Sequence, residues 1–342
     1  MKFDLPIQLS AASEMLLAEL PKRSQTILER RFGLRAGQPA TLDAIGKTYG
    51  ITRERVRQIE ADAFQKLRKG SAYQRLASLF ETLRGYIDRH GGVMAEHVLL
   101  PDIAEAPEHP HAHFLLSLAR PFQRISEDEA FHNRWHTSAD VAGAVEAALK
   151  ATAVHLAREN RVCSKEEVYA IFASQMVSLG KTPEAEHLDS YLKISKLIRA
   201  NSFDQWGHAT SPMIKPRGMR DMAYLVLQRV GKPLHFTEIT RLIGDMITKK
   251  AAHAQTVHNE LIKDKRFVLV GRGMYGMAEW GFEPGIVRDV IVSTLAQKPL
   301  SREEIVEQVL AKRQVKENTV LINLQNKRYF KKLPDGRYTS VV

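Results

Sequence analysis

The chain has 342 residues, of which 44% are hydrophobic and 26% charged, and its formal net charge is +11. This length predicts two or more domains, and no apolar run approaches the roughly 18 residues that a membrane span needs. An acidic, proline-containing start and a single cysteine, Cys163, argue against a signal peptide, a disulfide framework and a cysteine-based zinc cluster, so we expect a cytoplasmic protein.

Charge is distributed unevenly along the chain. Residues 21–70 hold 12 Lys/Arg against 5 Asp/Glu, whereas residues 92–140 hold 3 against 8. Residues 217–342 are basic again, with 22 against 13. Basic surfaces attract the phosphates of nucleic acids, so both ends of the chain are candidates for DNA contact. For the C-terminal stretch, lysines that only keep the surface soluble are an equally good explanation.

The first predicted helix of the basic segment lies within residues 20–34. Pro21 stands at its start and Gly33 at its end, which are the positions that these two residues favour. Four residues recur at helical spacing and predict its buried side: Ile27, Leu28, Arg31 and Phe32.

A helix, a tight turn and a second helix are predicted for residues 41–69. Gly50 marks the turn, and Thr52 is expected to cap the second helix, because its hydroxyl can accept a hydrogen bond from a free backbone N–H. At about 100° per residue, one side of the second helix faces a core. That side consists of Val56, Ile59, Ala63 and Leu67.

The opposite side of the second helix carries side chains that can read base edges. Arg pairs bidentately with guanine, Gln with adenine, and Glu accepts a hydrogen bond from cytosine. All three types occur there, at Glu54, Arg57 and Gln58, and Arg53 lies at the N-terminal end of the helix. This is the layout of a helix-turn-helix whose second helix enters the major groove of DNA.

The two sequence blocks LPKRSQTILERRFGL and TLDAIGKTYGITRERVRQIEADAFQKLRK, with the spacing between them, carry a family resemblance. Residues 16–69 resemble the promoter-reading domain, region 4, of the primary-type bacterial sigma factors. The resemblance implies a DNA-binding regulator of transcription, associated with the nucleoid, that binds double-stranded, promoter-like DNA.

The resemblance also assigns roles to individual residues. It implies base contacts from Arg53, Glu54, Arg57 and Gln58. It implies phosphate contacts from Arg31, Thr41, Thr52 and Arg55. The competing interpretation is that some of these arginines only pair with acidic residues on the helices, since pairs three or four residues apart are common.

In that family the domain also docks on the flap of the RNA polymerase β subunit. An alternative function is therefore a polymerase-associated factor, delta-like or sigma-competing, for which the apolar side of residues 16–34 matters more than Arg57.

In sigma factors the domain ends the chain and a promoter-melting domain precedes it. Here about fifteen residues precede it and some 270 follow, so we expect no promoter opening by this protein alone.

The rest of the chain repeats weakly. Trp135, Trp206 and Trp280 are 71 and 74 residues apart, each follows a helical stretch, and each is expected to close a β-wing against its own core. We therefore predict a mainly α fold: the helix-turn-helix domain followed by tandem winged-helix units with small β-wings. The predicted domains are residues 1–73, 74–139, 140–216, 217–284 and 285–342.

The fourth of these domains has a further resemblance. Its blocks MRDMAYLVLQRVGKPLHFTEITRLI and LIKDKRFVLVGRGMYGMAEWG resemble the HARE helix-turn-helix family, which is a winged helix. This implies a DNA- or polymerase-associated role, and no particular activity. Basic residues of the last two domains are candidates for phosphate contact: Lys249, Lys250, Lys263, Lys265, Arg266, Arg272, Lys327, Arg328, Lys331, Lys332 and Arg337.

Catalytic and metal chemistry has little support in the sequence. Three histidines within residues 109–113 invite a metal site, but their acidic, proline-containing flank predicts a loop and no second ligand cluster completes a tetrahedral site. Cys163 is expected to pack in or near a core. No P-loop, dinucleotide fingerprint or nucleophile elbow occurs, so we predict no enzyme, no metal and no cofactor. A DNA-modifying enzyme is supported only by the occurrence of the HARE family in restriction proteins.

Overall fold

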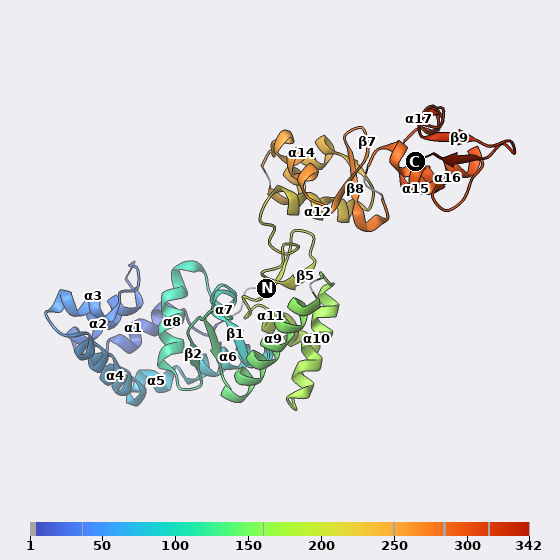
Figure 1. Ribbon diagram of the computed structural model, residues 1–342. Coiled ribbons are helices and arrows are strands. Elements are labelled where there is room, and N and C mark those ends of the chain that lie inside the picture. Colours follow the sequence, from blue (N-terminus) through green and yellow to red (C-terminus); the bar gives the residue numbers. More distant parts are fainter. Residues whose placement is uncertain are drawn as a thin grey trace. The chain divides into compact units, whose positions relative to one another are not determined.

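The computed structural model describes most of the chain, namely residues 5–35, 37–159, 161–248, 250–282, 285–313 and 315–341. It is mainly helical, with small antiparallel sheets of two or three strands, which confirms the predicted fold class (Figure 1). Among the described residues, no helix combines the length and the apolar character that crossing a lipid bilayer requires.

Two compact units make up the chain. The first consists of Met1–Ala200 and Asp204–Thr210, and the second of Asn201–Phe203 and Ser211–Val342. The five domains expected from the sequence are a finer division than this one and stay a prediction.

The first unit begins with four helices that contain the predicted helix-turn-helix (Figure 1). Helix α2 ends at Gly33 and helix α3 at Gly50, whose φ angles of 72° and 63° lie in the left-handed region that glycine adopts without a Cβ penalty. These glycines end the helices where the sequence predicts. The four helices are α1 (Leu9–Leu17), α2 (Lys22–Phe32), α3 (Leu42–Tyr49) and α4 (Arg53–Lys69).

Further helices and a three-stranded sheet follow. Strand β3 lies in the middle of the sheet and pairs antiparallel with both β1 and β2. Helix α8 packs against α1, α2 and α7, and it is buried on several sides. The elements are α5 (Ser71–Arg75), α6 (Ala77–Arg89), β1 (Val93–Ala95), α7 (Glu96–Ile103), η1 (Ala106–Glu108), α8 (His109–Leu118), β2 (Gln123–Ile125) and β3 (Arg134–His136).

One continuous hydrophobic core joins α8 to the N-terminal helices. It runs from Leu16 through Phe32 to Trp135. The ring of Phe114 on α8 lies 5.3 Å from that of Phe32 on α2 and 6.0 Å from that of Phe64 on α4. Helices α2 and α4 therefore share a core with α8.

Of residues 101–113, all but Ala104 and Glu105 lie in helices, so the loop predicted there from the sequence is wrong. Pro110 occupies the first turn of α8, where the missing backbone N–H costs no helical hydrogen bond. The ring of His109 contacts the carbonyl of Ala104 at 3.0 Å, whereas that of His113 lies 3.7 Å from the carboxylate of Glu96. These two histidines thus have different neighbours.

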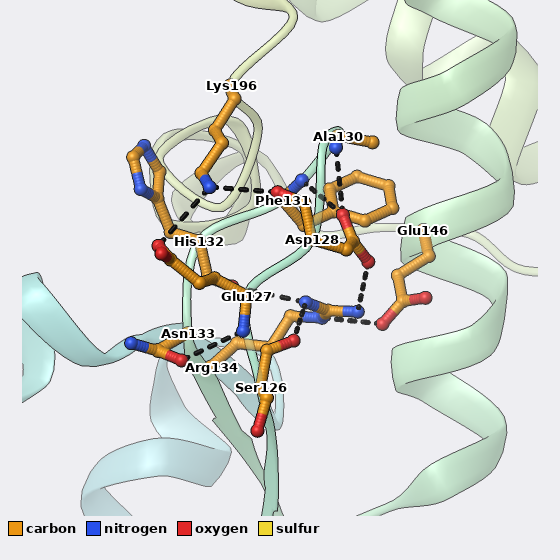
Figure 2. A network of polar contacts seen from close by, with 10 residues as sticks. All are labelled: Ser126, Glu127, Asp128, Ala130, Phe131, His132, Asn133, Arg134, Glu146 and Lys196. Atoms are coloured by element: carbon orange, nitrogen blue, oxygen red, sulfur yellow. Dashed lines mark hydrogen bonds and ion pairs between the residues drawn. The ribbon is translucent and has the colours of Figure 1, made fainter.

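A long helix, a second helix and a short hairpin complete the first unit. Helices α9 and α10 pack against each other, and the core between them includes Val145 and Phe172. Figure 2 shows Arg134 of β3, which connects the preceding segment to Glu146 on α9. The elements are α9 (Ala139–Glu159), α10 (Lys165–Ser178), η2 (Ala185–His187), α11 (Leu188–Leu192), β4 (Ile198–Ala200) and β5 (Trp206–His208).

The second unit begins with helices that precede a hairpin. Strand β8 pairs antiparallel with both β6 and β7. The winged-helix assignment of this segment and its membership of the HARE family stay predictions. The elements are α12 (Met219–Val230), β6 (Leu234–His235), α13 (Phe236–Ile243), η3 (Gly244–Thr248), α14 (Ala254–Lys263), β7 (Phe267–Gly271), β8 (Met274–Met277) and η4 (Ala278–Trp280).

The same arrangement recurs in shorter form at the C-terminal end. Helices α15, α16 and α17 pack around a small core that includes Ile291 and Phe330, and the hairpin β9–β10 follows them. The elements are α15 (Val287–Leu295), α16 (Arg302–Lys312), α17 (Glu317–Leu324), β9 (Phe330–Lys332) and β10 (Tyr338–Ser340).

The three tryptophans lie at or directly after the hairpins, as expected. Trp135 is 1% exposed in the core that also contains Phe32. Trp206 and Trp280 are partly buried, and each packs against the core of its own segment. All three side chains therefore pack against a core, Trp135 against one that it shares with Phe32 of α2, while their role in closing β-wings stays a prediction.

Candidate nucleic-acid interface

The turn between α3 and α4 depends on close backbone packing at Gly46. The backbone N–H of Ile51 donates to the carbonyl of Gly46 at 3.0 Å. A Cβ atom added at Gly46 would lie only 2.6 Å from the carbonyl oxygen of Ile51. Because that neighbour is backbone, it cannot move aside as a flexible side chain would. The angle between the two helices therefore requires glycine at this position.

Replacing Gly46 with alanine is expected to destabilise the first unit by about 1–3 kcal/mol, the usual cost of overpacking. It is also expected to weaken DNA binding, because α4 must tilt away from α3. Urea unfolding and duplex binding measure the two effects. The control is Gly85→Ala in α6, where nothing lies within 4 Å of an added Cβ. There alanine should stabilise the helix by roughly 0.5–1 kcal/mol. Equal changes in the free energy of unfolding and in duplex affinity for the two variants would contradict close packing at Gly46.

Both helices of the motif begin with a threonine cap. The Thr41 hydroxyl accepts from the backbone N–H of Ala44 at 3.2 Å, and that of Thr52 from Arg55 at 3.1 Å. The predicted cap at Thr52 is confirmed. Each hydroxyl is exposed and retains its own proton, which it can donate to a phosphate oxygen. The geometry is thus compatible with the phosphate contacts predicted for these two residues.

The side of α4 that faces the protein is the predicted one. Val56, Ala63 and Leu67 are at most 2% exposed, and Ile59 is partly buried. Val56 forms a small cluster with Ile27 of α2 and Ile45 of α3. This cluster fixes the rotation of α4 about its axis and thereby directs the opposite side toward solvent.

The predicted base-contacting residues lie together on that exposed side. The Arg57 guanidinium donates to Glu54 through Nε at 2.8 Å and through Nη2 at 2.7 Å. This hydrogen bonding holds the pKa of the Glu54 carboxyl below its usual range. Within the described residues, Arg53 forms no ion pair. Base contact by Arg53, Glu54, Arg57 and Gln58 stays a prediction.

Arg55 and Gln58 interact with each other on the same exposed surface. The Nη1 group of Arg55 donates to the side-chain oxygen of Gln58 at 3.1 Å. The amide nitrogen of Gln58 lies 3.5 Å from Glu54. Pairing between neighbours, the competing interpretation, therefore does occur on this helix. Every partner is exposed, however, so water screens these contacts and a ligand can replace them at small cost.

Arg31 differs from the other predicted contact residues, because it is only partly exposed. Its Nη1 donates to the carbonyl of Ala40 at 3.1 Å, and its Nε lies 3.7 Å from Glu60 of α4. Burial raises the pKa of the Glu60 carboxyl above its usual value, although the nearby guanidinium of Arg31 acts in the opposite direction. Arg31 thus joins α2 to α4 and to the segment before α3. A phosphate contact by Arg31 stays a prediction.

The sequence did not reveal that α8 covers the helix-turn-helix. Leu28 and Phe32, from the apolar side of residues 16–34, are buried in the core shared with α8. Arg68 at the end of α4 also donates to the carbonyl of Leu118 at 2.8 Å. The available signal was the apolar run of residues 114–118, which predicts a buried helix but not its partner.

One group of potential metal ligands comes together within the described part of the chain. Ligand atoms of Glu184, which precedes η2, and of Glu186 and His187 on η2 lie within 4.8 Å of one another. The two carboxylates are exposed, which is common for acidic groups that bind no ion. The group therefore gives no support for a metal-dependent reaction.

Comparison with known proteins identifies the N-terminal motif. A family model described as Sigma-70, region 4, matches residues 16–69. Over 68 residues, the chain is 47% identical to a curated relative from Bacillus sp, RNA polymerase sigma factor SigA. The match covers 20% of this chain and 18% of that sigma factor, so the chain spans only about a fifth of the relative. Residues 16–69 are therefore a sigma-70 region 4 helix-turn-helix domain.

Proposed function

We propose that this protein is a sequence-specific, non-catalytic regulator of transcription that reads double-stranded, promoter-like DNA through α4. The region 4 domain at residues 16–69 supports promoter-like DNA as the ligand. The observation that supports the proposal best is the exposed side of α4. Four side chains able to read bases lie together there, after the Thr52 cap: Arg53, Glu54, Arg57 and Gln58.

The pair formed by Arg57 and Glu54 prepares both side chains for base reading. Their side chains are 59% and 57% exposed, so their mutual attraction is weak in water and a base can replace it. Glu54 engages Nε and Nη2 of Arg57, which leaves Nη1 to donate to a guanine. Glu54 thereby restricts the guanidinium to a few orientations before DNA arrives.

Phosphate contacts set the position of α4 in the groove. Thr41 and Thr52 stand at the N-terminal ends of α3 and α4, where the helix dipoles favour a negative group. Arg55, which is exposed, lies about one helical turn after Thr52 on α4. These three residues are proposed to hold the DNA backbone, with Arg31 as a fourth contact if it exchanges Glu60 for a phosphate.

RNA polymerase is the alternative partner that a region 4 domain brings into consideration. Docking through the apolar side of residues 16–34 requires that side to be open, whereas Phe32 is 6% exposed in the core shared with α8. A protein partner would have to displace α8 first, so we favour DNA. Retention of the protein on polymerase in a nuclease-treated, high-salt lysate would support docking. Loss of the association there would support bridging by DNA.

In vitro selection of bound duplexes tests the proposal. Arg57→Ala is expected to broaden the preference at one base pair and to lower affinity for the best site by about 1–3 kcal/mol. The matched control is Lys66→Ala, an exposed cation two turns further along the same helix, which should keep the wild-type preference. Lys332→Ala is expected to weaken binding equally for all sequences. Full site selectivity in Arg57→Ala would show that α4 is not the reading helix.

A further inference from the structure

A largely apolar hollow lies in the C-terminal part of the second unit, where the end of α17 meets the hairpin β9–β10. Its volume is about 560 Å³, which is a size typical of ligand-binding pockets. Its apolar lining comes from Leu324, Phe330, Tyr338 and Val341. Leu324 and Phe330 belong to the buried core of this segment, whereas Val341 is 58% exposed. The floor of the hollow is therefore continuous with the core, and its rim is open to solvent.

Apolar surface continues from the hollow along α17. Gln325 lines the hollow, and Ile322 lies three residues before it, so the two side chains share one side of the helix. The side chain of Ile322 is 60% exposed. Helix α17 contains one acidic residue, Glu317, and no lysine or arginine, so it offers no charge that attracts a phosphate. An apolar surface of this extent is typical of a protein interaction site.

Positive charges border the hollow next to β9. Lys327 and Lys331 line it, both are exposed, and within the described residues neither forms an ion pair. In contrast, Arg337 in the turn of the hairpin is held by Asp335 at 2.6 Å. None of the described residues that line the hollow is acidic. The two ammonium groups therefore complement a partner that carries carboxylates beside a large apolar side chain.

Backbone pairing holds the wall of the hollow that the hairpin forms. The backbone N–H of Tyr338 donates to the carbonyl of Leu300 at 2.8 Å, and the N–H of Leu300 donates back at 3.1 Å. The ammonium of Lys332 lies over the Tyr338 ring, 5.9 Å from its centroid. Because the wall is formed before a partner arrives, docking orders few groups of this protein. The phosphate contact predicted for Lys332 does not depend on this site.

We propose that the hollow is a docking site for an acidic peptide segment of a partner protein, which inserts one large apolar side chain between α17 and β9. Carboxylates of the segment pair with Lys327 and Lys331. Burial of the apolar side chain supplies most of the affinity, and the two lysines select for acidic neighbours. A DNA backbone also pairs with lysines, but it has no apolar group that fills the hollow. The site uses no residue of α4, so the two proposals can fail independently.

Fluorescence anisotropy with the full chain and labelled synthetic peptides tests this site. The peptides carry one phenylalanine, tryptophan or leucine between aspartates and glutamates, and at least one of them is expected to bind. Replacing its apolar residue with serine should weaken binding by roughly 10- to 150-fold, as expected when one buried side chain is lost. Lys327→Glu/Lys331→Glu should weaken binding by about tenfold, because two ion pairs are lost.

Matched control variants separate the hollow from the general positive charge of the chain. Lys298→Glu/Lys316→Glu changes the net charge equally, at two exposed lysines that do not line the hollow, and should keep the wild-type affinity. Val341→Asp should weaken peptide binding, whereas Leu310→Asp on α16, where the side chain is 39% exposed, should not. All these positions are exposed, and thermal unfolding of each variant checks that the fold is retained.

Four results would overturn the proposal. The first is a lack of binding by every peptide. The second is equal affinity for the serine peptide, since no side chain would then fill the hollow. The third is an equal loss in the two double-lysine variants, since the attraction would then be unspecific. The fourth is a random-sequence duplex that loses affinity in Lys327→Glu/Lys331→Glu while no peptide binds, since the lysines would then contact phosphates.

Discussion

Phe114→Ala is expected to destabilise the helix-turn-helix together with the helices that follow it, by about 3–5 kcal/mol. Phe114 is fully buried on α8, and its ring meets those of Phe32 and Phe64. Removing it leaves a cavity in the one core that α2, α4 and α8 share. Because the chain contains two compact units, native-state hydrogen exchange of the amides in α2 and α4 measures this loss locally.

The matched control is Val154→Ala on α9, where the side chain is 58% exposed. That change should alter stability by no more than about 0.5 kcal/mol. The same reasoning predicts that a fragment of residues 1–73 exposes the apolar side of α2 and binds a hydrophobic dye, whereas the full chain does not. Undiminished protection of α2 and α4 in Phe114→Ala would show that α8 does not stabilise the helix-turn-helix.

The helix-turn-helix could be predicted from the sequence because its determinants are local. Gly33 and Gly50 end helices, Thr52 caps one, and the spacing of Val56 and Leu67 sets the buried side of α4. Each of these signals acts over a few residues. The cover formed by α8 depends instead on contacts such as that between Phe32 and Phe114, more than 80 residues apart, for which periodicity gives no partner.

The candidate site was predictable to a similar extent. The exposure of Glu54, Arg57 and Gln58 follows from the helical period, since they lie opposite the apolar side. The position of Arg31 did not follow, because its acidic neighbour, Glu60, lies on another helix.

Arg134→Ala is expected to cost the first unit about 3–5 kcal/mol, because it leaves a buried network without its central donor. Arg134 is 2% exposed. Its Nε donates to Glu146 on α9 at 2.6 Å, and its Nη1 donates to the carbonyl of His132 at 3.1 Å (Figure 2). The guanidinium also lies over the ring of Phe131, 4.9 Å from its centroid. Arg134 therefore holds the segment between β2 and β3 against α9.

A double-mutant cycle with Glu146 separates charge pairing from the bonds to backbone carbonyls. Glu146→Leu alone removes the carboxylate 2.6 Å from Nε but leaves the bonds to the carbonyls of Ser126 and His132. If pairing dominates, the double variant Arg134→Met/Glu146→Leu should lose much less stability than the sum of the losses in Arg134→Met and in Glu146→Leu, since apolar groups can replace a buried pair. Additive losses would show instead that Arg134 acts mainly by satisfying the carbonyls. Arg134→Lys should recover little in either case, because one ammonium cannot reproduce the planar set of donors.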